Sequence, residues 1–213
     1  MNLKIIGFVG LPGSGKGEAC RIAAMYGLPV LVMGDVIRRE AARLGVEPTD
    51  QNLGRIGSDL RAAEGPDAVA RRILDVAQAT GGDLVVVDGL RSLEEADFFR
   101  RHADRFYLVE VCAPAEARLR RLEARGRPDD PGAGKCGEEV TASCEGQRSP
   151  AAARLEQREW REMGWGMCDA MKSADFNLRN DGSLDEFHEN VKKLLNILIS
   201  STPASGHQID SGR

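Results

Sequence analysis

The chain has 213 residues, of which 42% are hydrophobic and 29% are charged, and its formal net charge at pH 7 is −4. This composition predicts one globular domain with a sizeable core, and the acidic balance argues against a general nucleic-acid or anionic-membrane surface. No apolar run is long enough for a signal peptide or a membrane span, and the five cysteines form no C-x-x-C pair. We therefore expect a cytoplasmic protein with reduced thiols and no membrane partner.

The first predicted elements are a buried strand at residues 3–9 and a helix at residues 16–26, and a glycine-rich turn joins them. The turn reads Gly10-Leu11-Pro12-Gly13-Ser14-Gly15-Lys16-Gly17. Glycines allow backbone amides to approach phosphates closely, the helix N-terminus adds partial positive charge, and Lys16 adds a full charge. This motif, in this context, predicts binding of a nucleoside triphosphate, with ATP and Mg²⁺ as the expected ligands.

The turn departs from the usual phosphate-binding loop at the position after the lysine. A Ser or Thr normally binds Mg²⁺ there, whereas this chain has Gly17, followed by Glu18. Two interpretations of Glu18 stay open. Its carboxylate either stabilises the positive end of the helix, or contacts the metal through a water molecule.

The rest of the chain alternates short apolar runs with helical periods. Further strands are expected at 29–32, 83–87, 105–111 and 175–178, and further helices at 35–44, 51–64, 67–79, 93–101, 114–125, 151–163 and 184–199. This alternation predicts an α/β fold, a three-layer P-loop NTPase with a parallel five-stranded sheet. Capping boxes are expected at Ser92-x-x-Glu95 and at Ser183-x-x-Glu186.

The predicted organisation is one domain over residues 1–199 and a disordered tail over residues 200–213. The periodic pattern fails at about 131–150, where small residues predominate, and we interpret that segment as a flexible loop or an inserted lid.

Two further positions carry candidate chemistry. Asp88 ends the apolar run Leu84-Val85-Val86-Val87, and such a carboxylate commonly orients a water molecule on Mg²⁺ beside the phosphate-binding loop. Asp35 and Arg38 are three residues apart, on one face of the helix that begins there. Arg38 could bind an anionic group of a second substrate, and Asp35 either acts as a base towards a hydroxyl or else orients Arg38 or caps the helix.

These motifs together resemble the adenylate kinase branch of the nucleoside monophosphate kinases. Gly34-Asp35-x-x-Arg38 looks like the acceptor-phosphate motif of that family, Leu53-Gly54-Arg55 like its acceptor-domain helix, and Asp88-Gly-Leu-Arg91 like its Asp-Gly-Phe-Pro-Arg. The resemblance implies a kinase in which helices at about 35–64 bind the acceptor. It also implies that Asp35, Arg38 and Arg91 contact the acceptor, a small nucleotide.

The resemblance extends to the lid and to the adenine site. It implies a short lid, with an insertion, at about 127–150, and donor-phosphate roles for Arg121, Arg125, Arg127 and Arg158, with weaker matches at Arg154 and Arg161. Asn180-Asp181-Gly182-Ser183 resembles the loop that cradles adenine in adenylate and dephospho-CoA kinases, which implies that Asp181 and Gly182 bind the nucleotide. The implied catalytic group is therefore Lys16, Asp88 and the lid arginines.

The similarity is closest to a family of archaeal adenylate-kinase-related P-loop proteins, often labelled dephospho-CoA-kinase-like. MGDVIRREA, PTDQNLG and VDGLRS carry it. The residues that read the AMP base in adenylate kinases are missing, since their places fall near Met33 and Glu95. Three functions stay open: transfer of the ATP γ-phosphoryl group to a nucleotide-like acceptor, which we favour; transfer to a hydroxyl, as in dephospho-CoA kinase; and ATP hydrolysis that acts on a protein or ribonucleoprotein partner.

Several other residues fit structural roles. The histidines are expected at the surface, and the eight-residue spacing of Cys136 and Cys144 does not favour a zinc site. Trp160, Trp165 and the Phe98–Phe99 pair are expected in the core rather than as base-stacking surfaces.

Overall fold

Five parallel strands form a single sheet in this computed structural model, which describes residues 3–125, 130 and 149–200. The strands are β1 (Lys4–Val9), β2 (Val30–Val32), β3 (Leu84–Leu90), β4 (Arg105–Cys112) and β5 (Phe176–Arg179), in the spatial order β2-β3-β1-β4-β5. β1 lies at the centre, where it pairs with both β3 and β4. The predicted α/β fold with a parallel five-stranded sheet is therefore confirmed.

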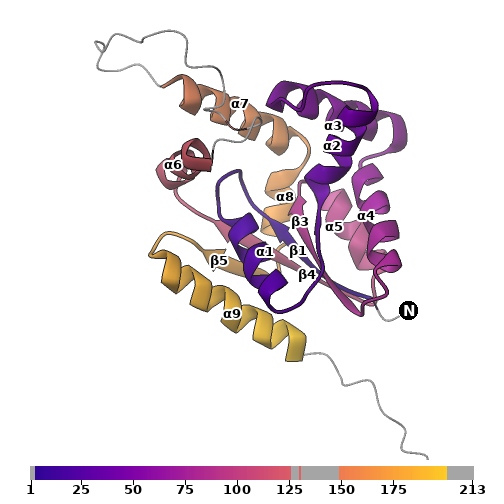
Figure 1. Cartoon of the computed structure of the whole chain (residues 1–213), viewed down its shortest axis with the longest axis vertical. Coiled ribbons are helices and arrows are strands. Elements are labelled where there is room, and N and C mark those ends of the chain that lie inside the picture. The colour runs from indigo at the N-terminus through magenta and orange to yellow at the C-terminus, as the bar shows by residue number, and fades with distance from the viewer. Residues whose placement is uncertain (1–2, 126–129, 131–148, 201–213) are drawn as a thin grey trace, which may run out of the picture.

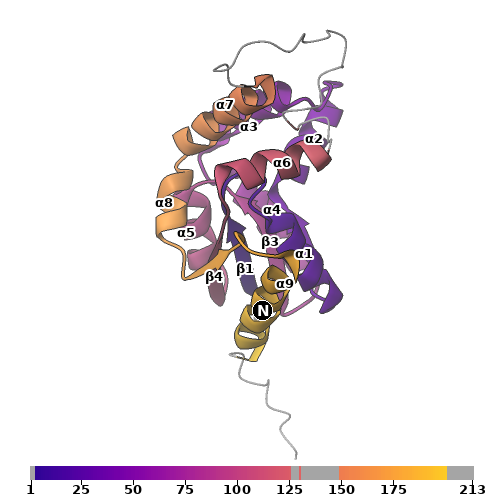
Figure 2. The same ribbon diagram turned by 90° about the vertical axis from the view of Figure 1, so that its left-hand side faces the viewer.

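Helices cover both faces of the sheet (Figure 1). They are α1 (Lys16–Met25), α2 (Met33–Arg43), α3 (Asp50–Glu64), α4 (Ala68–Ala79), α5 (Leu93–His102), α6 (Ala115–Arg125), α7 (Pro150–Gly164), α8 (Met167–Lys172) and α9 (Leu184–Ser200). Helices α1 and α9 pack on one face and α4, α5 and α8 on the other, whereas α3 and α7 lie side by side beyond one end of the strands (Figures 1 and 2). No helix in the described ranges is both long and apolar enough to cross a bilayer.

The side chains on the two faces of the central strand, β1, belong to two separate hydrophobic cores. Side chains alternate between the faces of a strand, so Ile5 and Val9 contribute to the core beneath α2, α4 and α5, while Ile6 and Phe8 contribute to the core beneath α1 and α9. All of these side chains are fully buried. Burial on both faces explains why the strand is continuously apolar in sequence.

The carboxyl ends of the strands form the functional edge of the sheet. In open α/β sheets, ligands bind beyond this edge. The glycine-rich turn follows β1 there, and α2 follows β2 directly. The pairing register of β1 and β3 shifts between Phe8 and Val9, so that Gly89, at φ +89°, is an extra residue immediately after Asp88. A bulge of this kind changes the direction of the strand next to a site.

Some local predictions were wrong, and others were confirmed. Helix α8 was not predicted, because six residues are too few to show a helical period. Trp160 is 69% exposed rather than in the core, whereas Phe98 and Phe99 are buried as expected. The box at Ser183 is complete, since the Glu186 carboxylate accepts from the Ser183 amide.

The predicted box at Ser92 is only half formed. The Ser92 hydroxyl accepts from the Glu95 amide, but the Glu95 carboxylate binds the Arg91 amide and the Arg61 guanidinium instead of the Ser92 amide. Glu95 is fully buried, and a buried carboxylate without a charged partner is strongly destabilising. Its pairing with Arg61 therefore stabilises the protein more than the second hydrogen bond of the capping box would.

The predicted tail and most of the predicted lid lie outside the described residues. Arg127, Cys136 and Cys144 are among them. Ser200, where the tail was expected to begin, is the last residue of α9.

Candidate functional site

The glycine-rich turn between β1 and α1 has the backbone that a phosphate-binding loop needs. Gly10, Gly13 and Gly15 have φ angles of +144°, +78° and +115°. A Cβ atom on Gly13 would lie 2.5 Å from the Arg118 carbonyl oxygen, and one on Gly15 would lie 2.2 Å from Asn180 Nδ2. Both the conformation and the close approach of neighbours therefore require glycine.

Lys16 lies over this loop. Its ammonium group donates to the carbonyl oxygens of Gly10, at 2.5 Å, and Leu11, at 3.2 Å. Burial lowers the pKa of Lys16, and the nearby carboxylates of Asp88 and Glu162 oppose that shift. The Lys16 amino group is thus held at the loop by two carbonyl groups, and two carboxylates favour its charged form.

Two arginines of α6 and one asparagine brace the outer side of the loop. Arg121 donates to the carbonyls of Ser14, at 3.3 Å, and Asn180, at 3.1 Å, and Asn180 Nδ2 donates to the Ser14 carbonyl at 2.8 Å. The buried Arg118 donates to the Pro12 carbonyl at 3.3 Å and pairs with Glu159. Arg118 was not among the predicted site residues, because its sequence context is only that of a helical arginine.

A cavity of about 380 Å³ opens beside the loop and is suited to the phosphates of a nucleotide. Its lining combines residues 12–18 of the loop and α1 with Arg121, Leu122, Arg125 and Arg158. Arg125 also binds the Asp130 carboxylate. The structure therefore brings three of the four predicted donor-site arginines to the phosphate-binding loop, and the fourth, Arg127, lies outside the described residues.

A second cavity, of about 650 Å³, adjoins the first on the side of α2. Its polar lining is Arg21, Asp35, Arg38, Asp88 and Arg125, and its apolar lining is Cys20, Ala24, Val30, Val32 and Pro48. Arg38 donates to the Asp35 carboxylate at 2.8 Å, as the three-residue spacing predicted. Asp35 and Arg38 of α2 and Asp88 of β3, two elements far apart in the sequence, thus line one cavity.

Arg91 is not part of the lining of that cavity. Its guanidinium lies 3.5 Å from the Glu162 carboxylate, where Arg158 also donates at 3.1 Å, and 5.6 Å from the centre of the Trp165 ring. Burial lowers the pKa of Arg91, and Glu162 opposes that shift. Glu162 is 3% exposed. The sequence contained no signal for this ion cluster, because its members come from the end of β3 and from α7.

Helix α7 is also tied to the start of α3. Asp50 accepts from Arg161 at 2.8 Å and lies 3.5 Å from Arg158. A Cβ atom on Gly54 would lie 2.6 Å from Arg161 Nε, so the glycine makes room for this side chain to cross α3. Arg154, by contrast, is exposed on α7. One of the predicted acceptor helices, α3, and the helix that follows the predicted lid, α7, are therefore in direct contact.

The predicted adenine loop lies at the end of β5. Asp181 pairs with Arg179 at 2.5 Å, and Asp181 and Gly182 line a separate cavity of about 620 Å³ at the start of α9. Asn180, the buried residue before them, carries the contact with the phosphate-binding loop.

Glu18 has two partners in the structure. Its carboxylate accepts from Arg21, at 2.6 Å, and lies 2.5 Å from His188 Nε2 in α9. Hydrogen bonding to Arg21 lowers the pKa of Glu18. His188, expected at the surface, is half-buried because it reaches this carboxylate.

The described residues contain no group of three His, Cys, Asp or Glu side chains that could bind a metal by themselves. They nevertheless fit a Mg²⁺ ion that is bound mainly by phosphates and water. Asp88 and Gly17 line the same cavity, and a side chain added at Gly17 would meet no atom within 4 Å. The open space at Gly17 leaves room for water in place of the usual hydroxyl.

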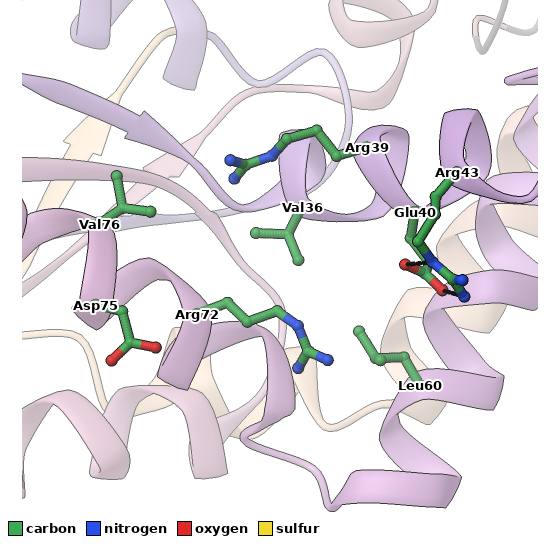
Figure 3. Close-up of a pocket in the computed structure, with 8 residues that line it drawn as sticks. All are labelled: Val36, Arg39, Glu40, Arg43, Leu60, Arg72, Asp75 and Val76. Carbon is green, nitrogen blue, oxygen red and sulfur yellow. Dashed lines mark hydrogen bonds and ion pairs between the residues drawn. The ribbon is translucent and has the colours of Figure 1, made fainter.

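One more cavity, of about 310 Å³, lies between α2, α3 and α4 (Figure 3). Val36, Leu60 and Val76 form its apolar part, and Arg43, which lies at its rim, pairs with Glu40. None of the predicted site residues lines it, so it does not belong to the nucleotide-binding edge.

Sequence comparisons assign this chain to a protein family. The family model described as an AAA domain matches residues 9–134, which include the phosphate-binding loop. A UPF0200 protein of Methanothrix thermoacetophila is 47% identical over 199 residues, covering 93% of this chain and 100% of the relative. The chain belongs to the UPF0200 family. A UPF0200 protein of Methanosarcina acetivorans is 42% identical over 200 residues, covering 93% and 97% of the two chains.

Solved structures share the fold at low sequence identity. TT1252 from Thermus thermophilus superposes with a TM-score of 0.58 and 22% identity, covering 92% of this chain and 98% of that one. Shikimate kinase from Bacteroides thetaiotaomicron superposes with a TM-score of 0.56 and 14% identity, with the same coverage. This UPF0200 chain therefore has the fold of P-loop kinases.

Proposed function

We propose that this UPF0200 protein is an ATP-dependent phosphotransferase of the nucleoside monophosphate kinase type, related to adenylate and dephospho-CoA kinases. The observation that carries the proposal is the adjacency of the two cavities. Gly17 and Arg125 line both, so the cavity of Asp35 and Arg38 is the immediate neighbour of the cavity beside the loop. A simple NTPase does not need a second cavity of about 650 Å³ at this point.

The residues of the donor cavity suit phosphoryl transfer. Charge in the transition state spreads over the equatorial oxygens of the transferred group, and preorganised cations stabilise it. Lys16, Arg121, Arg125 and Arg158 supply such cations from three different elements. Mg²⁺ would neutralise phosphate charge, and Asp88 would hold it through a water molecule.

The acceptor cavity supports a nucleotide-like acceptor with an anionic group. Arg38 is the guanidinium that lines it from α2, and the apolar wall formed by Ala24, Val30 and Val32 can accommodate a base or another planar group. Arg38 would exchange its contact with Asp35 for bidentate contacts with the acceptor phosphate.

A hydroxyl acceptor is the second candidate, and the position of Asp35 favours it. The Asp35 side chain is 57% exposed and lines the cavity, so its carboxylate is accessible to a bound hydroxyl. In that case Asp35 accepts the hydroxyl proton during attack on the γ-phosphoryl group, and Arg38 orients the carboxylate.

Phosphotransfer assays with a substrate panel test the proposal. The purified protein is incubated with Mg²⁺-ATP and nucleoside monophosphates or dephospho-CoA, alongside a sample without acceptor. We expect ADP formation to increase with one class of acceptor and to require Lys16, while Lys172→Ala, a change of an exposed lysine in α8, leaves it unchanged.

Variants of the acceptor cavity then separate the candidates. Arg38→Ala should raise the KM of a phosphate acceptor roughly 10- to 150-fold, the effect of losing a charge-assisted hydrogen bond. Asp35→Asn should instead lower kcat if the acceptor is a hydroxyl. ATP hydrolysis that depends on Lys16 but responds to no small acceptor would contradict the kinase proposal, and would favour an ATPase that acts on a protein or ribonucleoprotein partner.

A further inference from the structure

A buried carboxylate lies among the cations of the donor site. Glu162, in the last turn of α7, is 3% exposed and contacts Arg158, at 3.1 Å, and Arg91, at 3.5 Å. Burial disfavours the charged form of Glu162, but the charges of Arg91, Arg158 and Lys16 together lower its pKa. Glu162 is thus an anion held within electrostatic reach of the lysine that binds phosphates.

This arrangement is unexpected in an anion-binding site. A fixed carboxylate repels the phosphates of a nucleotide, and burying it costs free energy that its partners must offset. Packing alone does not require it, since a glutamine has nearly the same shape. Its charge therefore needs another explanation.

The explanation lies in the two guanidiniums that share it. Arg91 follows β3 and Arg158 belongs to α7, so their positions depend on two separate parts of the fold. The two guanidiniums repel each other, and the charge of Arg158 contributes to lowering the pKa of Arg91. A carboxylate between them removes that repulsion and fixes both side chains, while Asp50 holds Arg158 from the side of α3.

We propose that Glu162 is a positioning residue for phosphoryl transfer, whose carboxylate binds Arg91 and Arg158 together and thereby holds Arg158 in the wall of the donor cavity that Lys16 also lines. This inference rests on the proposed function, and it gives Arg91 a role in the ion cluster that fixes Arg158 rather than in the acceptor cavity.

Charge removal at constant shape is the decisive experiment. Glu162→Gln should lower the Kd of ADP and of a non-hydrolysable ATP analogue about threefold to tenfold, because a repulsive charge is gone. The same variant should lower ATP turnover about 10- to 100-fold, because the two guanidiniums are no longer held in place. Calorimetric titration and a coupled ADP assay measure the two effects, and circular dichroism checks the fold.

Two further variants complete the design. Glu162→Asp keeps the charge but withdraws it by one methylene, so the nucleotide Kd should stay near the wild-type value while turnover falls about threefold to 30-fold. Asp169→Asn makes the same change of charge on the exposed side of α8 and should alter neither quantity. If Glu162 had only a structural role, Glu162→Gln would lower the melting temperature but would not combine tighter nucleotide binding with slower turnover.

The results separate failure of the inference from failure of the proposed function. If the wild-type protein binds ATP and hydrolyses or transfers it, wild-type turnover or weaker nucleotide binding in Glu162→Gln overturns the inference alone. If Glu162→Gln does not fold, wild-type turnover in Glu162→Asp overturns it. Absence of ATP binding by the wild-type protein would overturn the proposed function, and the inference with it.

Discussion

Replacement of Gly15 by alanine should destabilise the protein through two separate effects. Gly15 has φ +115°, where a side chain strains the backbone, and its added Cβ atom would lie 2.2 Å from Asn180 Nδ2. Asn180 would have to move, and it would lose its hydrogen bond to the Ser14 carbonyl in a buried position.

The magnitude follows from these two terms. A non-glycine residue in this backbone region costs about 1–3 kcal/mol. A buried polar group left without its partner costs about 1–3 kcal/mol more. The free energy of unfolding should therefore fall by about 2–6 kcal/mol, which in a chain of this size lowers the melting temperature by roughly 5–20 °C.

Gly17, two residues further on, provides a matched control. It lies in the first turn of α1, and an added Cβ atom there meets nothing within 4 Å. Gly17→Ala should leave the free energy of unfolding unchanged, or raise it by up to about 1 kcal/mol, because alanine favours the helix. Urea unfolding of both variants measures the difference. Equal stability of the two variants would refute the reasoning.

Further predictions concern four other residues. Lys16→Ala should fold normally and lose roughly 10²- to 10³-fold in turnover, the scale of removing one preorganised donor; near wild-type turnover at saturating ATP would contradict the assignment. Trp160→Ala should change the free energy of unfolding by less than about 0.5 kcal/mol because the side chain is exposed. Trp165→Ala should cost about 2–4 kcal/mol, since that ring packs against three guanidiniums, and equal losses in urea unfolding would refute this contrast. Because the pKa of Glu162 is lowered in the fold, its ionisation stabilises the protein above its unfolded pKa of about 4.3 and that contribution is lost as pH falls through the folded value. Melting temperatures should therefore decline more steeply below about pH 4.3 in the wild type than in Glu162→Gln, and parallel curves would contradict the shift.

The sequence by itself determined the features that depend on neighbours along the chain. The strand at Lys4–Val9, the glycine-rich turn and the helix from Lys16 could be predicted because each is encoded by local spacing and backbone chemistry. The pairing of Asp35 with Arg38 was predictable for the same reason, since residues three apart share a helix face.

Only the tertiary structure decided which distant side chains meet. Glu95 shows the difference, because a local capping motif predicted its partner, whereas in the folded chain its carboxylate pairs with Arg61 of α3. Arg91 shows it as well, because its partner Glu162 lies 71 residues away along the chain, on a helix whose position is set by contacts with α6 and α8. Periodicity specifies the face of a helix on which a charge lies, but the partner of that charge depends on how the helices pack, which local sequence spacing does not contain.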